Sequence, residues 1–168
     1  MTFWSLNNVE PLRKYRFGVN GQWWFAKSVS LPSYELTTSE YQLINHKIKY
    51  PGIAEWADIE LVLIDTVQDW KDGALNKKIL FNNFKDSGYN LDGRNDGIKK
   101  ELLKALGDTF YIVQLNAAGE EVTKWTLINP FVKAIKFGDL DYGADDMVEI
   151  TITISYDSAT LEKTADPK

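Results

Sequence analysis

Apolar and polar residues alternate along much of this chain, a pattern that predicts half-buried β-strands. The clearest run spans residues 147–156. Its apolar side consists of Val148, Ile150, Ile152, Ile154 and Tyr156. The other side is polar and includes Glu149, Thr151 and Thr153. We therefore expect a strand with one buried face and one face that meets solvent or lines a polar space.

Shorter runs of the same kind predict further strands, most of them bounded by turn signals. These runs cover residues 15–19, 22–30, 41–50, 58–66, 110–115, 122–128 and 131–137. Asn20-Gly21 predicts a tight hairpin between the first two, and residues 116–119 predict a second hairpin. Pro51-Gly52 is expected to end the third run, because proline cannot donate a hydrogen bond to a neighbouring strand.

The period becomes helical between residues 69 and 88. The predicted stripe consists of Trp70, Ala74, Phe81 and Phe84, with Leu80 beside them. Asp69 is a candidate N-cap and Gly88 a candidate stop. A polar loop at 90–97 precedes a second, short helix predicted at 99–106, which Gly107 ends.

This order predicts a mainly β (α+β) protein, an antiparallel β-barrel or sandwich with one long and one short flanking helix. We expect a single domain over residues 1–168, with an extended N-terminal arm (1–12) and a flexible C-terminal tail (158–168). No apolar stretch approaches the roughly 18 residues of a membrane-spanning helix. The first basic residue is Arg13, which is not the order of an export signal.

Composition narrows the possible functions. The net charge is −5, which argues against ordinary nucleic-acid binding. The absence of cysteine excludes disulfides and thiolate chemistry. Six tryptophans favour a large packed surface, inside the chain or between subunits. A platform for stacking sugars is the alternative use of such a surplus.

Candidate chemistry is sparse. His46 is the only histidine, so a Ser-His-Asp arrangement would need it, and it lies within a predicted strand beside Asn45 and Lys47. The loop from Asp92 to Gly97 fails the calcium pattern, because Arg94 stands where an oxygen ligand is required. We expect no catalytic site, metal or cofactor.

Two charged groups admit more than one interpretation. Asp139, Asp141, Asp145 and Asp146 suit a solvated acidic turn, and paired carboxylates would also suit a glycosidase. Several copies of this loop in an oligomer would create a strong negative field. Lysines gather on the predicted helices, as a solvated face or as a positive surface for an acidic partner. They include Lys77, Lys78, Lys99 and Lys100.

Six segments, in this order, resemble the tail tube proteins of contractile-tailed bacteriophages. They are AKSVSLP (26–32), NHKIKYPG (45–52), WADIELVLID (56–65), WTLINP (125–130), FGDLDY (137–142) and VEITITISYD (148–157). The likeness spans residues 14–156, and the length suits the T4-like branch. The loop at 90–97 and the residues after Asp157 have no counterpart.

The resemblance implies a non-enzymatic structural subunit. Members of that family form hexameric rings that stack into a hollow tube, and each subunit adds strands to a continuous inner barrel. The implied partners are further copies of the chain, a contractile tail sheath protein, a baseplate or tube initiator, a tape measure protein and transiting DNA. The implied location is the virion tail, assembled in the host cytoplasm, with no membrane anchor.

Three groups of site residues follow as expectations. Glu149, Thr151 and Thr153 are expected to face the lumen. Contacts between rings or subunits are expected from Tyr41, Asn45, His46, Lys47, Lys49 and Tyr50. Lys77, Lys78, Lys99 and Lys100 are expected to face the sheath. The alternatives are a type VI secretion tube subunit, a baseplate or tube-terminator relative and, from another class, a glycan-binding domain.

Overall fold

Two four-stranded antiparallel sheets pack face to face in the computed structural model, which describes residues 11–20, 25–66, 77–89, 97–103 and 106–163. Sheet A has the order β1 (Phe17–Val19), β6 (Thr109–Leu115), β7 (Glu121–Ile128), β10 (Ser158–Lys163). Sheet B has the order β2 (Ala26–Val29), β5 (Ile59–Ile64), β9 (Glu149–Ser155), β8 (Phe131–Lys136). The remaining elements are the hairpin β3 (Tyr34–Leu43) and β4 (His46–Trp56), helix α1 (Lys77–Asp86) and the 3-10 helix η1 (Lys100–Leu102).

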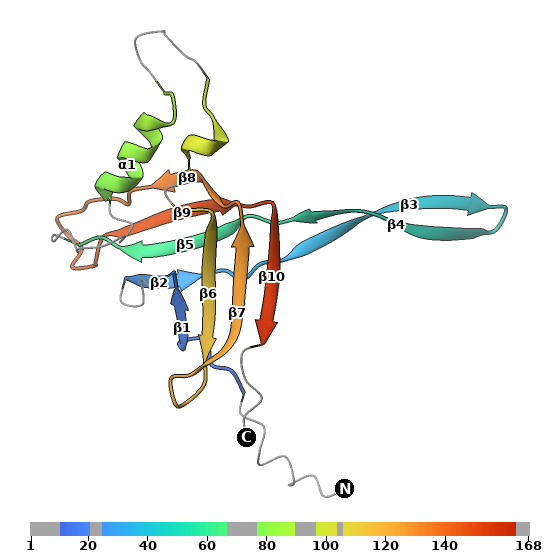
Figure 1. The fold of residues 1–168 in the computed structure, drawn as a ribbon, viewed down its shortest axis with the longest axis horizontal. Coiled ribbons are helices and arrows are strands. Elements are labelled where there is room, and N and C mark those ends of the chain that lie inside the picture. Colours follow the sequence, from blue (N-terminus) through green and yellow to red (C-terminus); the bar gives the residue numbers. More distant parts are fainter. Residues whose placement is uncertain (1–10, 21–24, 67–76, 90–96, 104–105, 164–168) are drawn as a thin grey trace, which may run out of the picture.

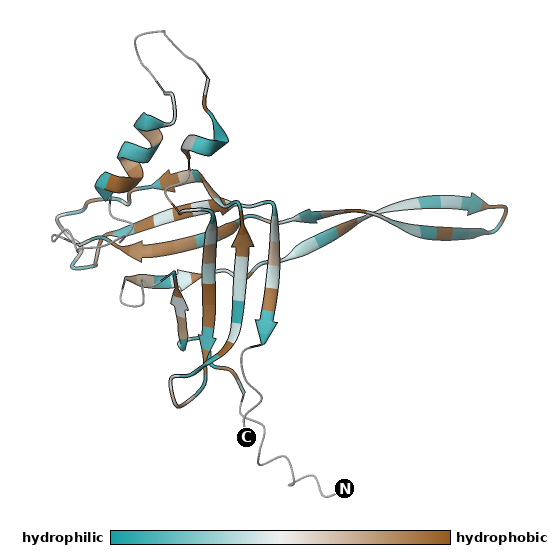
Figure 2. Cartoon of the chain, in the orientation of Figure 1, coloured by the Kyte–Doolittle hydropathy of each residue, from teal (hydrophilic) through white to brown (hydrophobic). Residues whose placement is uncertain are grey.

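The strands of sheet A run across those of sheet B, α1 and η1 lie beside β8, and the β3–β4 hairpin projects as a long arm (Figure 1). Hydrophobic residues concentrate in the strands of the two sheets, whereas the arm carries many hydrophilic ones (Figure 2). The arm therefore gains little from the core and must be stabilised largely by its own strand pairing.

The core lies between the sheets because strand side chains alternate with a period of two. Ile150, Ile152 and Ile154 of β9 are at most 1% exposed. They meet buried residues of β5, β6 and β7, namely Ile59, Leu61, Leu63, Phe110, Ile112 and Leu127. Full burial of each such side chain contributes about 1.5–3 kcal/mol, so this layer is the main source of stability.

The prediction of a mainly β, antiparallel architecture is confirmed. The β6–β7 hairpin forms through residues 116–119 as expected, where Asn116 Oδ1 accepts hydrogen bonds from the N–H groups of Ala118 and Glu120. The sheets do not close into a barrel within the described chain, so the sandwich alternative is the one observed.

The predicted hairpin at Asn20-Gly21 is wrong. β1 pairs with β6 and β2 pairs with β5, so the two strands belong to different sheets. Asn20 adopts a φ of +39° and its N–H donates to the carbonyl of Tyr111 at 2.9 Å. This bond ties the turn to β6, and the chain then crosses to the other sheet.

The predicted C-terminal tail is also wrong over residues 158–163, which form β10. This strand pairs with β7 from Ser158↔Ile128 to Lys163↔Thr123. The segment is short and weakly apolar, so its own pattern gave no strand signal, and the edge of β7 supplies its hydrogen bonds. Residues 164–168 lie outside the described part of the chain, as do residues 1–10 of the predicted N-terminal segment.

The helical region differs in detail from its prediction. Leu80 of α1 is buried, but Phe81 and Phe84 of the predicted stripe are 54% and 39% exposed. Trp70, Ala74 and the candidate cap Asp69 lie outside the described residues. The helix ends at Asp86, just before Gly88, whose φ is +103°. Of the second predicted helix, at 99–106, the described residues contain the single turn η1, and residues 104–105 lie outside them.

Truncating the core should destabilise the protein strongly. We expect Ile152→Ala to lower the free energy of unfolding by about 2–5 kcal/mol, because it leaves a cavity at a fully buried site. Ile98→Ala, at a residue that is 57% exposed, should change it by less than about 0.5 kcal/mol. Urea unfolding followed by tryptophan fluorescence measures the free energy of unfolding of both variants. Equal losses in the two would contradict the assignment of Ile152 to the core.

Candidate functional site

The arm formed by β3 and β4 is the most exposed element of the described chain. Every residue of β3 is exposed, as is every residue of β4 except Ile48 and Trp56. The predicted strand at 41–50 is therefore incorrect in its bounds: the chain turns between Leu43 and His46, with Asn45 in the turn. Both strands are long, and ten residues of β3 reach about 33 Å.

Pro51-Gly52 does not end the strand, because a bulge accommodates both residues. The register shifts from Thr38↔Pro51 to Leu36↔Ala54, which sets Gly52 and Ile53 opposite Thr37. Thr37 Oγ1 accepts the N–H of Ile53 at 2.8 Å and donates to its carbonyl at 3.3 Å. A Cβ on Gly52 would lie 2.4 Å from that oxygen, so any larger residue here would displace the Thr37 hydroxyl.

The apolar side chains change from one face of the arm to the other at the bulge. Beyond it, the pairs Ser39↔Tyr50, Tyr41↔Ile48 and Leu43↔His46 share one face. Before it, the apolar pairs Tyr34↔Trp56 and Leu36↔Ala54 lie on the opposite face. In β3 the spacing of the apolar residues produces this change, since side chains alternate with a period of two. In β4 the extra residue of the bulge brings Ile48 and Tyr50 onto the face opposite Ala54 and Trp56.

The root of the arm is attached to the core by aromatic rings. Tyr34 packs on Trp56 at 5.4 Å between ring centroids, and Trp56 packs on Tyr156 at 5.9 Å. Tyr156 is 7% exposed, and burial raises the pKa of its phenol. Near the root Trp56 is partly buried, but Tyr34 stays 64% exposed. On the outer apolar face Tyr41 is 58% and Tyr50 54% exposed.

The second candidate surface is the face of sheet B that points away from the core. The residues expected to face the lumen lie here, on the outer side of β9, and all three are partly exposed: Glu149, Thr151 and Thr153. The register adds Ser28, Glu60, Ala134, Lys136 and the less polar Val62 and Ile64. The structure thus brings the predicted residues together with partners on three neighbouring strands.

Three lysines on or beside this polar face are paired with carboxylates. Lys27 binds Glu149, Lys133 binds Asp58 at 2.6 Å, and Lys136 lies 3.6 Å from Asp139. The hydrogen bond from Lys133 holds the pKa of Asp58 below its ordinary value, against the opposing effect of desolvation. Each of these three lysines is therefore matched by a carboxylate.

The lysines expected to face the sheath divide into two kinds. Lys77 forms an ion pair with Asp65 at 2.5 Å, and Lys100 forms one with Asp157 at 2.5 Å. Both pairs link a helical segment to a residue beside the sheets. The hydrogen bond from Lys100, followed by one from Asn129, lowers the pKa of Asp157. Lys78 and Lys99 are exposed. Sequence reasoning missed both ion pairs because their partners are distant in the chain.

Catalytic geometry is not found among the described residues. His46 lies at the exposed start of β4, next to the turn. The carboxylates at 139, 141, 145 and 146 sit in an exposed loop, and no group of three metal-ligating side chains occurs in the described part. An apolar cavity of about 270 Å³ lies between α1 and β8, lined by residues that include Phe81, Phe84 and Ile135. No described helix is long and apolar enough to cross a membrane.

Solved structures with the same fold come from contractile injection machines. A chain in the structure of the anti-feeding prophage cap (tube terminating cap) matches with a TM-score of 0.67 at 18% identity, covering 98% of this chain and 100% of that chain. A chain in the sheath–tube complex of an extracellular contractile injection system, PVC, matches with a TM-score of 0.66 at 20% identity, covering 98% and 99%. A chain in the PVC sheath/tube terminator structure gives 0.68 at 21% identity, covering 92% and 99%.

No protein-family model matches the sequence, and no curated protein matches it either. Each of the three structural matches covers at least 92% of this chain. They confirm, at the level of fold, the resemblance to tube proteins of contractile tails that the sequence indicated.

The bulge should control the geometry of the arm. We expect Thr37→Val, which keeps the shape but removes both hydrogen bonds, to speed amide exchange at Ile53 about fivefold, as for the loss of about 1 kcal/mol. Gly52→Ala should disturb the same amides through a clash. Gly143→Ala, where an added Cβ meets nothing closer than 3.6 Å, is the control. Unchanged exchange in both bulge variants would refute this role.

Acid should weaken the ion pair on the polar face. The pKa of Asp58 is lowered by folding, so its contribution to stability is present above the ordinary value of 3.8 and is lost as pH falls through the lowered value. We expect Lys133→Met to reduce the fall in unfolding free energy between pH 7 and pH 2. Lys78→Met, at an exposed helix position, should leave that fall unchanged. Identical pH profiles for Lys133→Met and wild type would contradict the assignment.

Proposed function

We propose that this chain is a ring-forming structural subunit of the tube in a contractile tail or contractile injection machine. The observation that supports it best is the construction of sheet B. One face of the sheet is buried in the core and the other is polar, and among the described residues no strand lies beyond β2 or β8. Such open edges are normally protected, because they invite pairing with another chain.

Cyclic repetition of sheet B would close these edges without changing its pattern. β2 and β9 run in one direction, and β5 and β8 run in the other. Rotation about an axis parallel to the strands preserves each direction. β8 of one copy would therefore meet β2 of the next in the antiparallel sense, and every further copy would continue an all-antiparallel barrel.

The polar face of sheet B would then form the lumen wall, with Glu149, Thr151 and Thr153 at its centre. Leu80 of α1 belongs to the core, which lies on the opposite side of this sheet, so the helical segments would lie outside the wall. The chain as a whole is acidic, and each of the three lysines on or beside this wall is paired with a carboxylate, so no excess of positive charge remains there. DNA could pass such a wall without strong retention, since free cationic side chains are needed to bind phosphates.

The finer parts of the proposal come from the resemblance to phage tail tubes. They are hexameric rings, a contractile sheath around them, a baseplate or initiator below them, and tape measure protein and DNA inside. The virion tail is the corresponding location. In this arrangement Lys78 and Lys99 would offer positive charge to the sheath, while Lys77 and Lys100 hold the helical segments in place.

A tube-terminating role is the second candidate, because two of the matched structures are described as a tube-terminating cap and a sheath/tube terminator. A terminator would form one ring and stop, whereas a tube subunit would elongate. A type VI secretion-type subunit would give isolated rings as well. The glycan-binding alternative finds little support, because the carboxylates of the acidic loop are exposed.

Labelling during assembly tests the proposed function. Because the chain has no cysteine, Thr151→Cys and Lys78→Cys each provide a single reactive site. We expect hollow tubes by negative-stain electron microscopy. In the tubes, Thr151→Cys should become at least about tenfold less reactive toward a bulky polyethylene glycol maleimide, since the pore restricts access. Lys78→Cys should stay reactive.

Two results would contradict this function. One is a monomer at every concentration tested, with or without a matched initiator complex. The other is a tube in which Thr151→Cys and Lys78→Cys react at equal rates with the bulky reagent. Single rings that never elongate would instead favour the terminator role.

A further inference from the structure

An apolar cavity of about 270 Å³ lies at the β8 edge of sheet B, lined mainly by residues of α1, by Leu103 and by β8. Leu80 and Val132 of this lining belong to the core, so the cavity lies on the core side of the sheet. Phe81 and Phe84 also line it and are 54% and 39% exposed. The cavity therefore extends from the core to the surface, where large exposed apolar groups mark interaction sites.

The lining limits what the cavity can hold. Among its described lining residues, Asn83 and Lys133 carry polar side chains, and the ammonium group of Lys133 is paired with Asp58 at 2.6 Å. The occupant that fits is therefore an uncharged, apolar group. An apolar cavity of about 150 Å³ holds benzene, so this larger one has room for the indole ring of a tryptophan.

The N-terminal segment, residues 1–16, supplies apolar groups of this kind. Residues 1–10 lie outside the described part of the chain and include one charged side chain and the apolar residues Phe3, Trp4, Leu6 and Val9. The described residues 11–16 keep Leu12 48% and Tyr15 73% exposed. Trp4 is the largest apolar side chain of the segment and matches the size of the cavity.

The segment and the cavity of one chain lie at opposite ends of strand β6. The carbonyl of Arg16 accepts the N–H of Leu115, the last residue of β6. At the other end, the N–H of Asn129, in the connection to β8, donates to the carbonyl of Asp108. Figure 1 shows α1 and the start of β1 on opposite sides of the sandwich.

A chain can barely reach its own cavity with this segment. Strand β6 alone spans about 20 Å, and the cavity lies beyond its end. The chain from Trp4 to Pro11 reaches at most about 25 Å when it is fully extended. The segment would have to stretch along the whole of sheet A to place Trp4 at α1, so another copy is the better source of the occupant.

The ring of the proposed function brings the segment of a second copy to the cavity. Residues 11–16 lead into β1, and β1 lies beside β2 (Figure 1). β2 and β8 are the opposite edges of sheet B. When β8 of one copy meets β2 of the next, residues 11–16 of that next copy come to the side of the first copy that carries α1 and the cavity.

We propose that the N-terminal segment of each copy docks in the apolar cavity of the adjacent copy in the same ring, an inference that rests on the proposed function. Trp4 occupies the cavity, beside Phe81 and Phe84. Tryptophan is a common anchor of such contacts, because it buries a large area in a desolvated pocket. The contact joins two different surfaces of the subunit, so repetition around the ring closes it. It ties each subunit to the next outside the wall, in addition to the pairing of β8 with β2.

Cross-linking of a double variant tests the contact directly. The chain has no cysteine, so Trp4→Cys combined with Phe81→Cys provides one pair of reactive positions. Mild oxidation should convert assembled rings into a ladder of disulfide-linked oligomers on a non-reducing gel. The ladder should end at the number of copies in a ring, because each copy links to one neighbour on each side.

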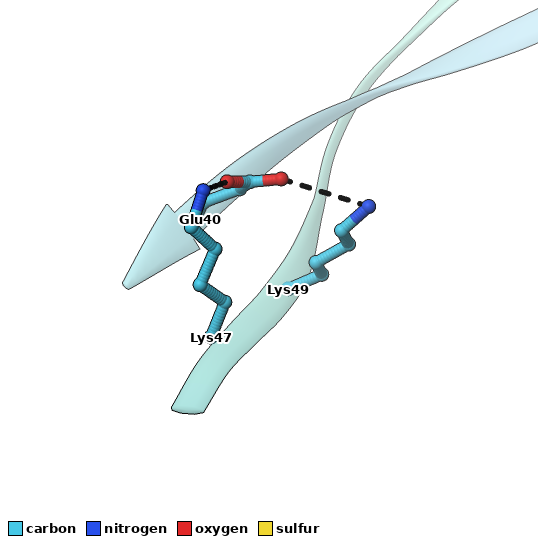
Figure 3. Close-up of polar contacts among 3 residues, drawn as sticks. All are labelled: Glu40, Lys47 and Lys49. Carbon is cyan, nitrogen blue, oxygen red and sulfur yellow. Dashed lines mark hydrogen bonds and ion pairs between the residues drawn. The ribbon is translucent and has the colours of Figure 1, made fainter. Parts of the chain in front are cut away.

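The matched control is Trp4→Cys combined with Lys47→Cys, which should give at least about tenfold less of the linked products. Lys47 is exposed on the arm, where it and Lys49 share Glu40 at 3.2 Å and 3.6 Å (Figure 3). Three results with Trp4→Cys and Phe81→Cys would overturn the proposal. They are a cross-linked monomer without a ladder, a ladder that runs far beyond the ring, and assembled rings without any cross-link.

The concentration at which half of the subunits form rings gives a second readout. Trp4→Ala should raise it about tenfold or more, whereas Trp4→Phe should keep it within about threefold of wild type. Leu103→Trp, which fills the cavity from within, should raise it to a similar extent and add little when combined with Trp4→Ala. Leu161→Ala, at a residue that is 53% exposed on β10, is the control. Circular dichroism verifies that each variant is folded, and equal assembly of Trp4→Ala and wild type would contradict the docking.

The outcomes separate this inference from the proposed function. If wild type forms rings or tubes but the double variant gives no ladder and Trp4→Ala assembles normally, the docking is wrong and the tube function stands. If wild type forms neither rings nor tubes and no cross-link appears, both are wrong. A ladder that ends at the size of the ring supports both.

Discussion

Strand β9 is an inner strand of sheet B, with one face in the apolar core and the other on the polar surface. Its side chains alternate, so three isoleucines enter the core while Glu149, Thr151 and Thr153 face outward. A shift of one residue in its pairing with β5 would exchange these sets and bury a glutamate and two threonines. The sandwich, the polar wall and the orientation of both neighbouring connections depend on this one register.

The same register explains why the molecule looks incomplete as a monomer. A central strand fixed between β5 and β8 leaves two edges whose backbone groups have no strand beside them in the described chain. The arm adds a further surface of exposed tyrosines and isoleucine that the chain itself does not cover. Exposed edges and aromatic surface both favour association, and copies related by rotation and by stacking would satisfy each of them.

Much of the fold could be predicted from local pattern. The alternation in residues 148–156 and the turn at Asn116 were sufficient for β9 and for the β6–β7 hairpin. Long-range pairing decided the rest. β10 has little pattern of its own and forms because β7 offers hydrogen bonds. Of the arm, only residues 41–50 were predicted to form a strand. Pro51 normally indicates the end of a strand, but here a bulge opposite Thr37 lets the strand continue.

The candidate site was predicted in outline. The residues assigned to the lumen lie together on one face of sheet B, and those assigned to contacts between subunits lie together on the arm, although whether they make those contacts stays a prediction. The pairing of Lys77 with Asp65 and of Lys100 with Asp157 could not be foreseen, because 12 and 57 residues separate the partners. The two faces of the arm were equally hidden, since they follow from the register.

The central claim is that copies of this chain join through the edges of sheet B and keep its polar face inward. Cryo-electron microscopy of the assembled protein, at a resolution that separates strands, tests it most directly. The account predicts β8 of one subunit beside β2 of the next in a continuous antiparallel barrel, with Thr151 toward the axis. An assembly in which the polar face of β9 points outward, or in which these two edges do not meet, would contradict it.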